Sequence, residues 1–194
     1  MIVKSLHQFQ VEVLGIVPDL AERFAAMIDD PAYSYEWREY AIQHLANTLA
    51  FSSDPAAGVE KLMLTMRLGQ DSMPGTAMLQ LSRLERDGTV TLDQRFAAGV
   101  LAMAQDESSP LLNRISAFGL LGERRVLAGL PVLRLGAIAP QPSLRRTAIA
   151  SLGQIGAAAD RELIVAACLD ADPAVATAAS AALVSIDRRL AAVP

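Results

Sequence analysis

The sequence contains few of the residues that carry nucleophilic or metal chemistry. Its 194 residues include one cysteine, Cys168, and two histidines, His7 and His44. One cysteine excludes an intramolecular disulfide, and zinc sites need several ligands at fixed spacing. Neither histidine has a second His or a Cys at such a spacing. We therefore expect no metal, no cofactor and no catalytic residue, and we interpret Cys168, which lies among apolar residues, as a buried side chain.

Long apolar runs are also missing. Polar residues interrupt the amino-terminal segment MIVKSLHQFQVEV, and no later run approaches the about 18 apolar residues that a membrane-spanning helix needs. We expect no membrane segment and a cytoplasmic protein, provided that no signal precedes Met1.

Excess charge of one sign is lacking as well, since the formal net charge is −4. Binding to nucleic acid requires clustered cations, and the candidates are the arginine pairs at 124–125, 145–146 and 188–189. Solvated helix ends are the simpler interpretation of these pairs, so we expect no nucleic-acid partner. Glycine-rich phosphate loops, nucleophile elbows and paired-carboxylate motifs are absent too.

What the sequence does contain is an internal repeat. The pattern Arg, two residues, Ala, three residues, Leu recurs with starts 36, 40, 31 and 31 residues apart. Pro replaces the Arg in the second copy and Ala replaces it in the fifth. The repeat positions are Arg38, Ala41 and Leu45; Pro74, Ala77 and Leu81; Arg114, Ala117 and Leu121; Arg145, Ala148 and Leu152; Ala176, Ala179 and Leu183.

This spacing predicts five helices, because Ala and Leu four residues apart lie on one helical face. The small Ala lets a neighbouring helix approach, while the Leu fills the space beside it. An apolar segment of helical length precedes each copy, at residues 20–28, 57–68, 92–104, 129–138 and 161–169. The sequence therefore predicts an all-α protein of about five stacked helical hairpins.

Signals for helix ends support this phasing. Asp54-Pro55, Ser109-Pro110 and Asp172-Pro173 each offer an N-cap oxygen followed by a proline suited to a first helical turn. Thr91 and Gln94 have the spacing of a capping box, and Gly88, Gly122 and Gly156 fall where helices should stop. The alternating segment FQVEV is interpreted as part of a leading helix.

The segment PSLRRTAIASLGQIG resembles the second helix of a HEAT repeat, whose pattern is Asp-x-x-Val-Arg-x-x-Ala-x-x-x-Leu-Gly. DPAVATAASAALVSI keeps the Asp and the Val but not the Arg. The short period is similar to that of bacterial HEAT-like proteins, among them phycobilin lyase subunits. The resemblance implies a right-handed α-solenoid. We predict one HEAT-like repeat domain at residues 18–190, with repeats at 18–52, 53–88, 89–125, 126–156 and 157–190, and a leading helix or cap at residues 1–17.

In HEAT repeats the motif Asp and Arg commonly pair between adjacent repeats. Arg38, Arg114 and Arg145 match the arginine, but Asp172 is the only acid at the matching position. The resemblance thus implies one such pair, between Arg145 and Asp172. The chain departs from the HEAT-repeat di-iron hydroxylases, because it has no His-Glu motif. Trp37 precedes a repeat arginine, where an apolar core residue belongs, so we interpret it as a packing residue.

The resemblance also implies that the second helices line a concave surface. Residues one, two, five, six and nine positions after each repeat start should then point away from the hairpin core. Among them, Tyr40 and Arg83 are the main candidates for partner contact, because such residues dominate interface hot spots. The full set of candidate partner-binding residues is Tyr40, Gln43, His44, Gln80, Arg83 and Arg146. The alternative is that these are ordinary residues of a helix surface.

The last repeat has no charged residue between Pro173 and Ile186. A terminal repeat usually needs a polar outer face. Further repeats, self-association or a partner would each cover this helix, and harmless exposure of alanines is the alternative.

Two functions follow as hypotheses. The first is a non-catalytic scaffold that binds a partner protein or peptide along the concave face. The second is a lyase-like accessory subunit that binds a prosthetic group or chromophore and aids its attachment to an acceptor protein. A visible absorbance band in the purified protein would favour the second.

Overall fold

The computed structural model describes residues 19–52 and 54–191, which form ten α-helices, two short 3-10 helices and no strand. The prediction of an all-α protein is confirmed for this part of the chain. The expected leading helix or cap at residues 1–17, with FQVEV and His7, lies outside the described residues. None of the described helices is long and apolar enough to cross a bilayer.

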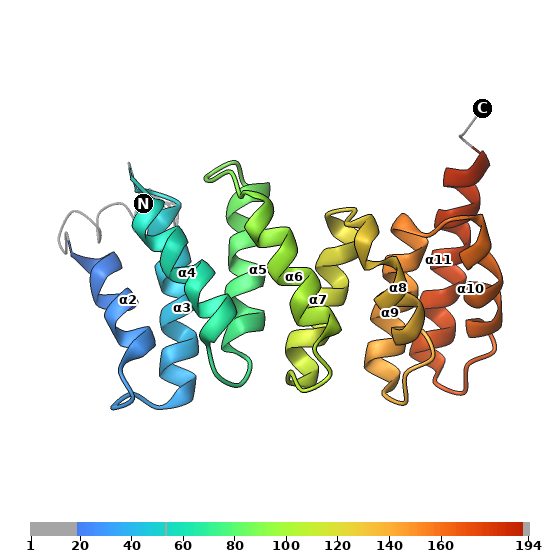
Figure 1. Ribbon diagram of the computed structural model, residues 1–194, viewed down its shortest axis with the longest axis horizontal. Coiled ribbons are helices and arrows are strands. Elements are labelled where there is room, and N and C mark those ends of the chain that lie inside the picture. Colours follow the sequence, from blue (N-terminus) through green and yellow to red (C-terminus); the bar gives the residue numbers. More distant parts are fainter. Residues whose placement is uncertain (1–18, 53, 192–194) are drawn as a thin grey trace, which may run out of the picture. The chain divides into compact units, whose positions relative to one another are not determined.

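The chain divides into two compact units, Met1–Leu92 and Asp93–Pro194, which we call unit 1 and unit 2. The helices of unit 1 are α2 (Leu20–Asp29), α3 (Tyr35–Leu49), α4 (Ala56–Leu68) and α5 (Met73–Arg86). Within this unit α2 packs on α3 and α4 packs on α5, so that they form two hairpins, and α3 also contacts α5 (Figure 1, blue to green).

Unit 2 contains three helix pairs. Its elements are α6 (Gln94–Gln105), α7 (Leu111–Glu123), η1 (Leu127–Gly129), α8 (Leu130–Gly136), α9 (Pro142–Ile155), η2 (Ala158–Asp160), α10 (Arg161–Ala167) and α11 (Pro173–Ala191). The helices α6 and α7, α8 and α9, and α10 and α11 pack in pairs, and the second helices α7, α9 and α11 contact one another in turn (Figure 1, green to red).

The core of each unit comes from the helix faces that carry the repeated Ala and Leu. Nine of these side chains are buried: Ala41, Leu45, Ala77, Leu81, Ala117, Leu121, Ala148, Leu152 and Ala179. Leu183 is only half-buried, whereas Ala182 and Ile186 on the same helix are buried. The buried face of α11 is therefore rotated slightly from the one that the repeat pattern indicates.

The helix ends follow some of the sequence signals. Asp172 accepts hydrogen bonds from the backbone N–H groups of Ala174 and Val175 at the start of α11. Gly156 follows the last residue of α9, and Gly88, just beyond α5, has a φ of 75°, which glycine adopts without strain.

Three signals for helix ends were wrong. Thr91 does not cap α6; Asp93 does, by accepting the N–H of Arg95. The Ser109 hydroxyl donates to Asp106 and does not cap α7. Gly122 lies inside α7 and does not end it. The missing side chain at this position lets α9 approach.

The close approach of the second helices in unit 2 explains two glycines. A Cβ placed on Gly122 would lie 2.7 Å from the Cβ of Ser151 on α9, and one on Gly153 would lie 2.7 Å from the Cα of Ala182 on α11. Real Cβ atoms essentially never come so close, so the helices can pack at these points only where a side chain is missing.

This lateral packing overturns part of the expected surface. Four residues that were expected to point away from the core are buried: Gly75, Leu120, Ser151 and Ala182. The reason is that each second helix also packs sideways against its neighbour, as in α7, α9 and α11. The Ser151 hydroxyl donates across the α7–α9 contact to the carbonyl oxygen of Phe118 at 2.8 Å.

The expected ion pair between Arg145 and Asp172 is also wrong. The Arg145 guanidinium donates from Nε and Nη2 to the two carboxylate oxygens of Asp170, both at 2.8 Å. Asp172 instead uses its carboxylate to cap α11, as described above. The guanidinium beside Asp170 lowers the pKa of that carboxyl below the usual value of 3.8.

Candidate functional site

Three ring-bearing residues gather on one flank of α3 in unit 1, and we call them the α3 aromatic face: Trp37, Tyr40 and His44. Trp37 meets Tyr40 edge to face with ring centroids 5.8 Å apart, and the centroids of Tyr40 and His44 are 4.0 Å apart. His44 also stacks on Phe24 of α2 at 5.3 Å. The rings thus form a continuous cluster from α2 along α3.

This cluster is open to solvent at its outer end. Trp37 is 57% exposed and Tyr40 is 49% exposed, whereas His44 is half-buried. The interpretation of Trp37 as a packing residue was therefore wrong. Helical spacing could not decide this, because Trp37 stands three residues before Tyr40 but also four residues before the buried Ala41. The buried face of α3 is formed by Ala41 and Leu45 instead.

On its other flank α3 contacts α5 through a polar network. The Tyr35 and Ser72 hydroxyl groups are hydrogen-bonded to each other, and the Tyr35 oxygen accepts the Ser72 backbone N–H at 2.9 Å. The carboxylate of Glu39 accepts hydrogen bonds from the hydroxyl groups of Ser72 at 3.0 Å and Thr76 at 2.5 Å. Removal from water raises the pKa of the Tyr35 phenol, and the nearby Glu39 carboxylate adds to that effect.

Arg83 of α5 completes this network at the other end of the helix pair. Its Nη2 donates to the amide oxygen of Asn47 on α3 at 2.9 Å, and its Nε donates to Gln80 at 3.0 Å. Its Nη1 lies 3.6 Å from a carboxylate oxygen of Asp87. Two residues predicted to contact a partner, Gln80 and Arg83, are thus hydrogen-bonded to each other, and Arg83 is also hydrogen-bonded to α3.

The structure therefore brings most of the predicted partner-binding residues into unit 1. Tyr40 and His44 lie in the α3 aromatic face, Gln43 is exposed on the same helix, and Gln80 and Arg83 lie on α5. Arg146 belongs to unit 2, where it is exposed on α9. The candidate site is accordingly defined within unit 1.

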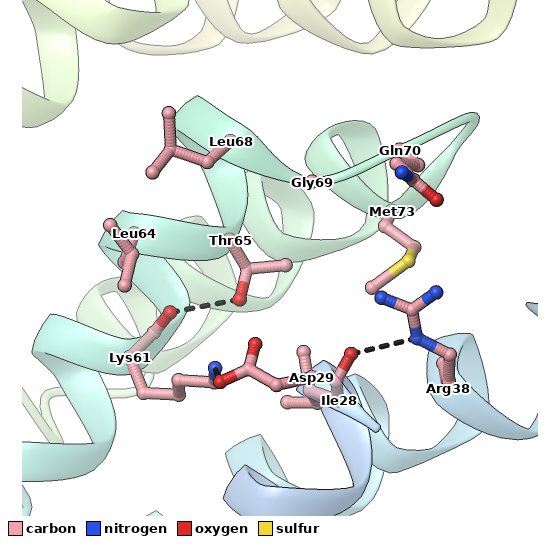
Figure 2. A pocket seen from close by; sticks show the side chains of 10 residues that line it. All are labelled: Ile28, Asp29, Arg38, Lys61, Leu64, Thr65, Leu68, Gly69, Gln70 and Met73. Carbon is pink, nitrogen blue, oxygen red and sulfur yellow. Dashed lines mark hydrogen bonds and ion pairs between the residues drawn. The ribbon is translucent and has the colours of Figure 1, made fainter. Parts of the chain in front are cut away.

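A small cavity of about 170 Å³ also lies in unit 1, and the repeat arginine Arg38 is one of the residues that line it. The Nε of Arg38 donates a hydrogen bond to the carbonyl oxygen of Ile28 at 2.8 Å. Figure 2 shows this bond, with the rest of the Arg38 guanidinium pointing toward Met73. Lys61 lines the same cavity and pairs with Asp29. This cavity is too small for most organic ligands.

Within the α3 aromatic face, the titratable group with a shifted pKa is His44. Burial lowers the pKa of the His44 imidazole below its usual 6.5, so the ring is neutral at physiological pH. The described residues contain no group of three or more His, Cys, Asp or Glu side chains that could hold a metal ion.

Comparison with known proteins gives little further direction. No family model matches the chain, and no curated protein matches it. Among solved structures it is similar to human deoxyhypusine hydroxylase in complex with glycerol, with 18% sequence identity over 87% of this chain and 74% of that chain, and a TM-score of 0.40.

Proposed function

We propose that this protein is a HEAT-like scaffold that binds a partner protein through the α3 aromatic face and performs no chemistry of its own. The observation that carries the proposal is the exposure of Trp37 and Tyr40, at 57% and 49%, side by side on one helix. Trp and Tyr are the residues most enriched at interface hot spots, because they bury much apolar area and keep a polar tip.

The surroundings of these rings support a binding role. Hydrogen bonds of Glu39, Asn47 and Arg83 join α3 to α5 on the other flank of α3. A partner that covers the rings would therefore bind a helix that is already held in place, which lowers the entropy cost of binding.

The repeat character of the protein is part of the same proposal. We assign the hairpins to HEAT-like repeats of a right-handed α-solenoid on the basis of the Arg, Ala and Leu spacing in the sequence. The contacts of α3 with α5, and of α9 with both α7 and α11, support this assignment within each unit. Stacked hairpins offer long surfaces for protein recognition, which suits a scaffold.

The proposal is tested by affinity capture from lysate of the source cells, using tagged wild-type chain, Trp37→Ala/Tyr40→Ala and Leu112→Ala in parallel. Leu112 is a matched control, because it is 64% exposed but lies on α7 in unit 2. We expect at least one protein that is captured by the wild type and by Leu112→Ala and is lost with the double variant.

Far-UV circular dichroism would show whether the double variant keeps its helices. Capture of the same proteins by all three chains, with the helices intact, would show that the α3 aromatic face is not the contact surface.

A further inference from the structure

Arg114 in unit 2 occupies the same repeat position as Arg145. The two arginines are 31 residues apart in the sequence, one on α7 and the other on α9. Arg145 is fully engaged: two of its nitrogens donate to Asp170, and Nη1 donates to the carbonyl oxygens of Ala139 and Pro140 at 2.9 and 3.0 Å. Arg145 therefore shows how an arginine at this repeat position can find an acceptor for each of its three nitrogen atoms.

The carboxylate that Arg145 uses has no counterpart beside Arg114. The residue 31 positions before Asp170 is Ala139, whose methyl group accepts no hydrogen bond. The Nε of Arg114 is buried and has no hydrogen-bond partner in the part of the chain that the structure describes. Its guanidinium carbon lies 6.0 Å from the centre of the Phe118 ring, which does not replace an acceptor for the N–H.

A cavity of about 620 Å³ lies where the missing carboxylate would be, and Arg114 and Ala139 both line it. Its volume is within the range of small-molecule sites. Leu135 and Ile138 form part of its apolar wall although they are 67% and 69% exposed, and Leu144 forms another part. The cavity thus combines a buried cationic donor with apolar surface that is open to solvent.

The equivalent arginine of unit 1 shows that an absent acid alone does not create such a site. Leu68 precedes the repeat position of α5 by the same six residues as Ala139 precedes that of α9. However, Arg38 gives its Nε to a backbone carbonyl, and the cavity there is only about 170 Å³. Arg114 differs in both respects, because its Nε has no acceptor among the described residues and its cavity measures about 620 Å³.

We propose that the Arg114 cavity binds an aliphatic monocarboxylate. The ligand carboxylate takes the place beside Arg114 that Asp170 has beside Arg145, and it accepts hydrogen bonds from the Nε–H group and from one terminal N–H group. The aliphatic chain covers Leu135 and Ile138. Glu107 also lines the cavity, and its charge disfavours a ligand with a second carboxylate.

The test uses octanoate as the probe, titrated by isothermal calorimetry at neutral pH into the full chain. The decisive variant is Ala139→Asp, which supplies within the chain the carboxylate that Arg145 already has. Ala166→Asp is the control, because Ala166 is exposed on α10 and does not line the cavity. 1-Octanol serves as a ligand of the same chain length without the carboxylate.

We expect octanoate to bind the wild type and Ala166→Asp, and to bind Ala139→Asp about tenfold more weakly or worse, since a charge-assisted hydrogen bond is lost. 1-Octanol should bind the wild type more weakly than octanoate by a similar factor. Ala139→Asp should melt at or above the wild-type temperature, because its new side chain satisfies Arg114.

Three results would overturn the proposal: no octanoate binding to the wild type, unchanged binding to Ala139→Asp, or equal affinity for octanoate and 1-octanol. Should Ala139→Asp fail to fold, Arg114→Met replaces it, since methionine keeps an apolar stem and removes the charge. That variant should lose the preference for octanoate over 1-octanol, and retention of the preference would contradict the proposal.

Discussion

The second helices of the two units meet in different ways, although the same hairpin pattern specifies both. In unit 1, α3 and α5 meet through hydrogen-bonding side chains, among them Glu39 with Ser72 and Asn47 with Arg83. In unit 2, α7, α9 and α11 meet where Gly122 and Gly153 leave no room for a side chain. The contact in unit 1 depends on hydrogen-bonding partners, whereas the contacts in unit 2 depend on the absence of side chains at two glycines. The two units should therefore respond to different substitutions.

The largest effect is expected from Gly153→Ala in unit 2. The added methyl would lie 2.7 Å from the Cα of Ala182, and backbone cannot move aside as a side-chain tip can. We expect a loss of about 1–3 kcal/mol in the free energy of unfolding. Urea denaturation followed by far-UV circular dichroism measures it.

Gly119→Ala is the matched control on α7. A Cβ there would lie 3.8 Å from the Thr147 Cγ2, which is an ordinary contact, so helix propensity should leave stability unchanged or raise it by up to about 1 kcal/mol. Equal destabilisation by both variants would show that close approach is not what distinguishes unit 2.

Asp170→Ala should have the next largest effect. The side chains of Arg145 and Asp170 are 18% and 13% exposed, compared with 47% and 45% for Arg161 and Asp187. Asp170→Ala should therefore lower the melting temperature more than Asp187→Ala does. The loss should be smaller than that of Gly153→Ala, because Arg145 keeps two backbone carbonyls as acceptors.

The pH dependence gives a second readout for this pair. The folded pKa of Asp170 is lowered, so its contribution is complete above the unfolded value of about 3.8 and is lost as the pH falls from there through the folded pKa. The difference in melting temperature between wild type and Asp170→Ala should shrink in that acidic range. A difference that stays constant down to the lowest pH would argue against an ion pair.

A smaller effect is expected from Glu39→Leu in unit 1. This change removes the acceptor that Ser72 and Thr76 share, and should cost about 1 kcal/mol in the free energy of unfolding. Glu39→Gln keeps an acceptor oxygen and should cost less. If the two variants are equally stable, the polar network does not contribute to the contact between α3 and α5.

The smallest change in stability is expected from Trp37→Ala. Because Trp37 is 57% exposed, its removal should alter the free energy of unfolding by about 0.5 kcal/mol, the usual scale for surface positions. A loss of several kcal/mol would return Trp37 to the packing role that the sequence indicated.

Repeat spacing was sufficient to predict the helices but not what their flanks contact. The segment at residues 161–169 was expected to be helical, and α10 occupies most of it, because apolar periodicity and capping residues act within a few turns. The partner of Arg145 depended on competition between two nearby carboxylates. The backbone N–H groups that begin α11 engage Asp172, so Asp170 is the acid that pairs with Arg145.

The candidate site was predictable only in part. Tyr40 and His44 were among the predicted contacts, whereas Trp37 was assigned to the core because it precedes a repeat arginine. The absence of a carboxylate partner for Arg114 could have been anticipated, since Ala139 stands where the next repeat has Asp170. The cavity itself could not, because its volume depends on how α8 and α9 pack.

Site-specific photo-crosslinking would show whether the α3 aromatic face touches a partner protein. Gln43, which is exposed on α3, and Leu112 on α7 would each be replaced by p-benzoylphenylalanine in the tagged chain. In lysate of the source cells, we expect position 43 to crosslink to the protein that Trp37→Ala/Tyr40→Ala fails to capture, and we expect no such crosslink from position 112. A crosslink to that protein from position 112 and none from position 43 would contradict this expectation.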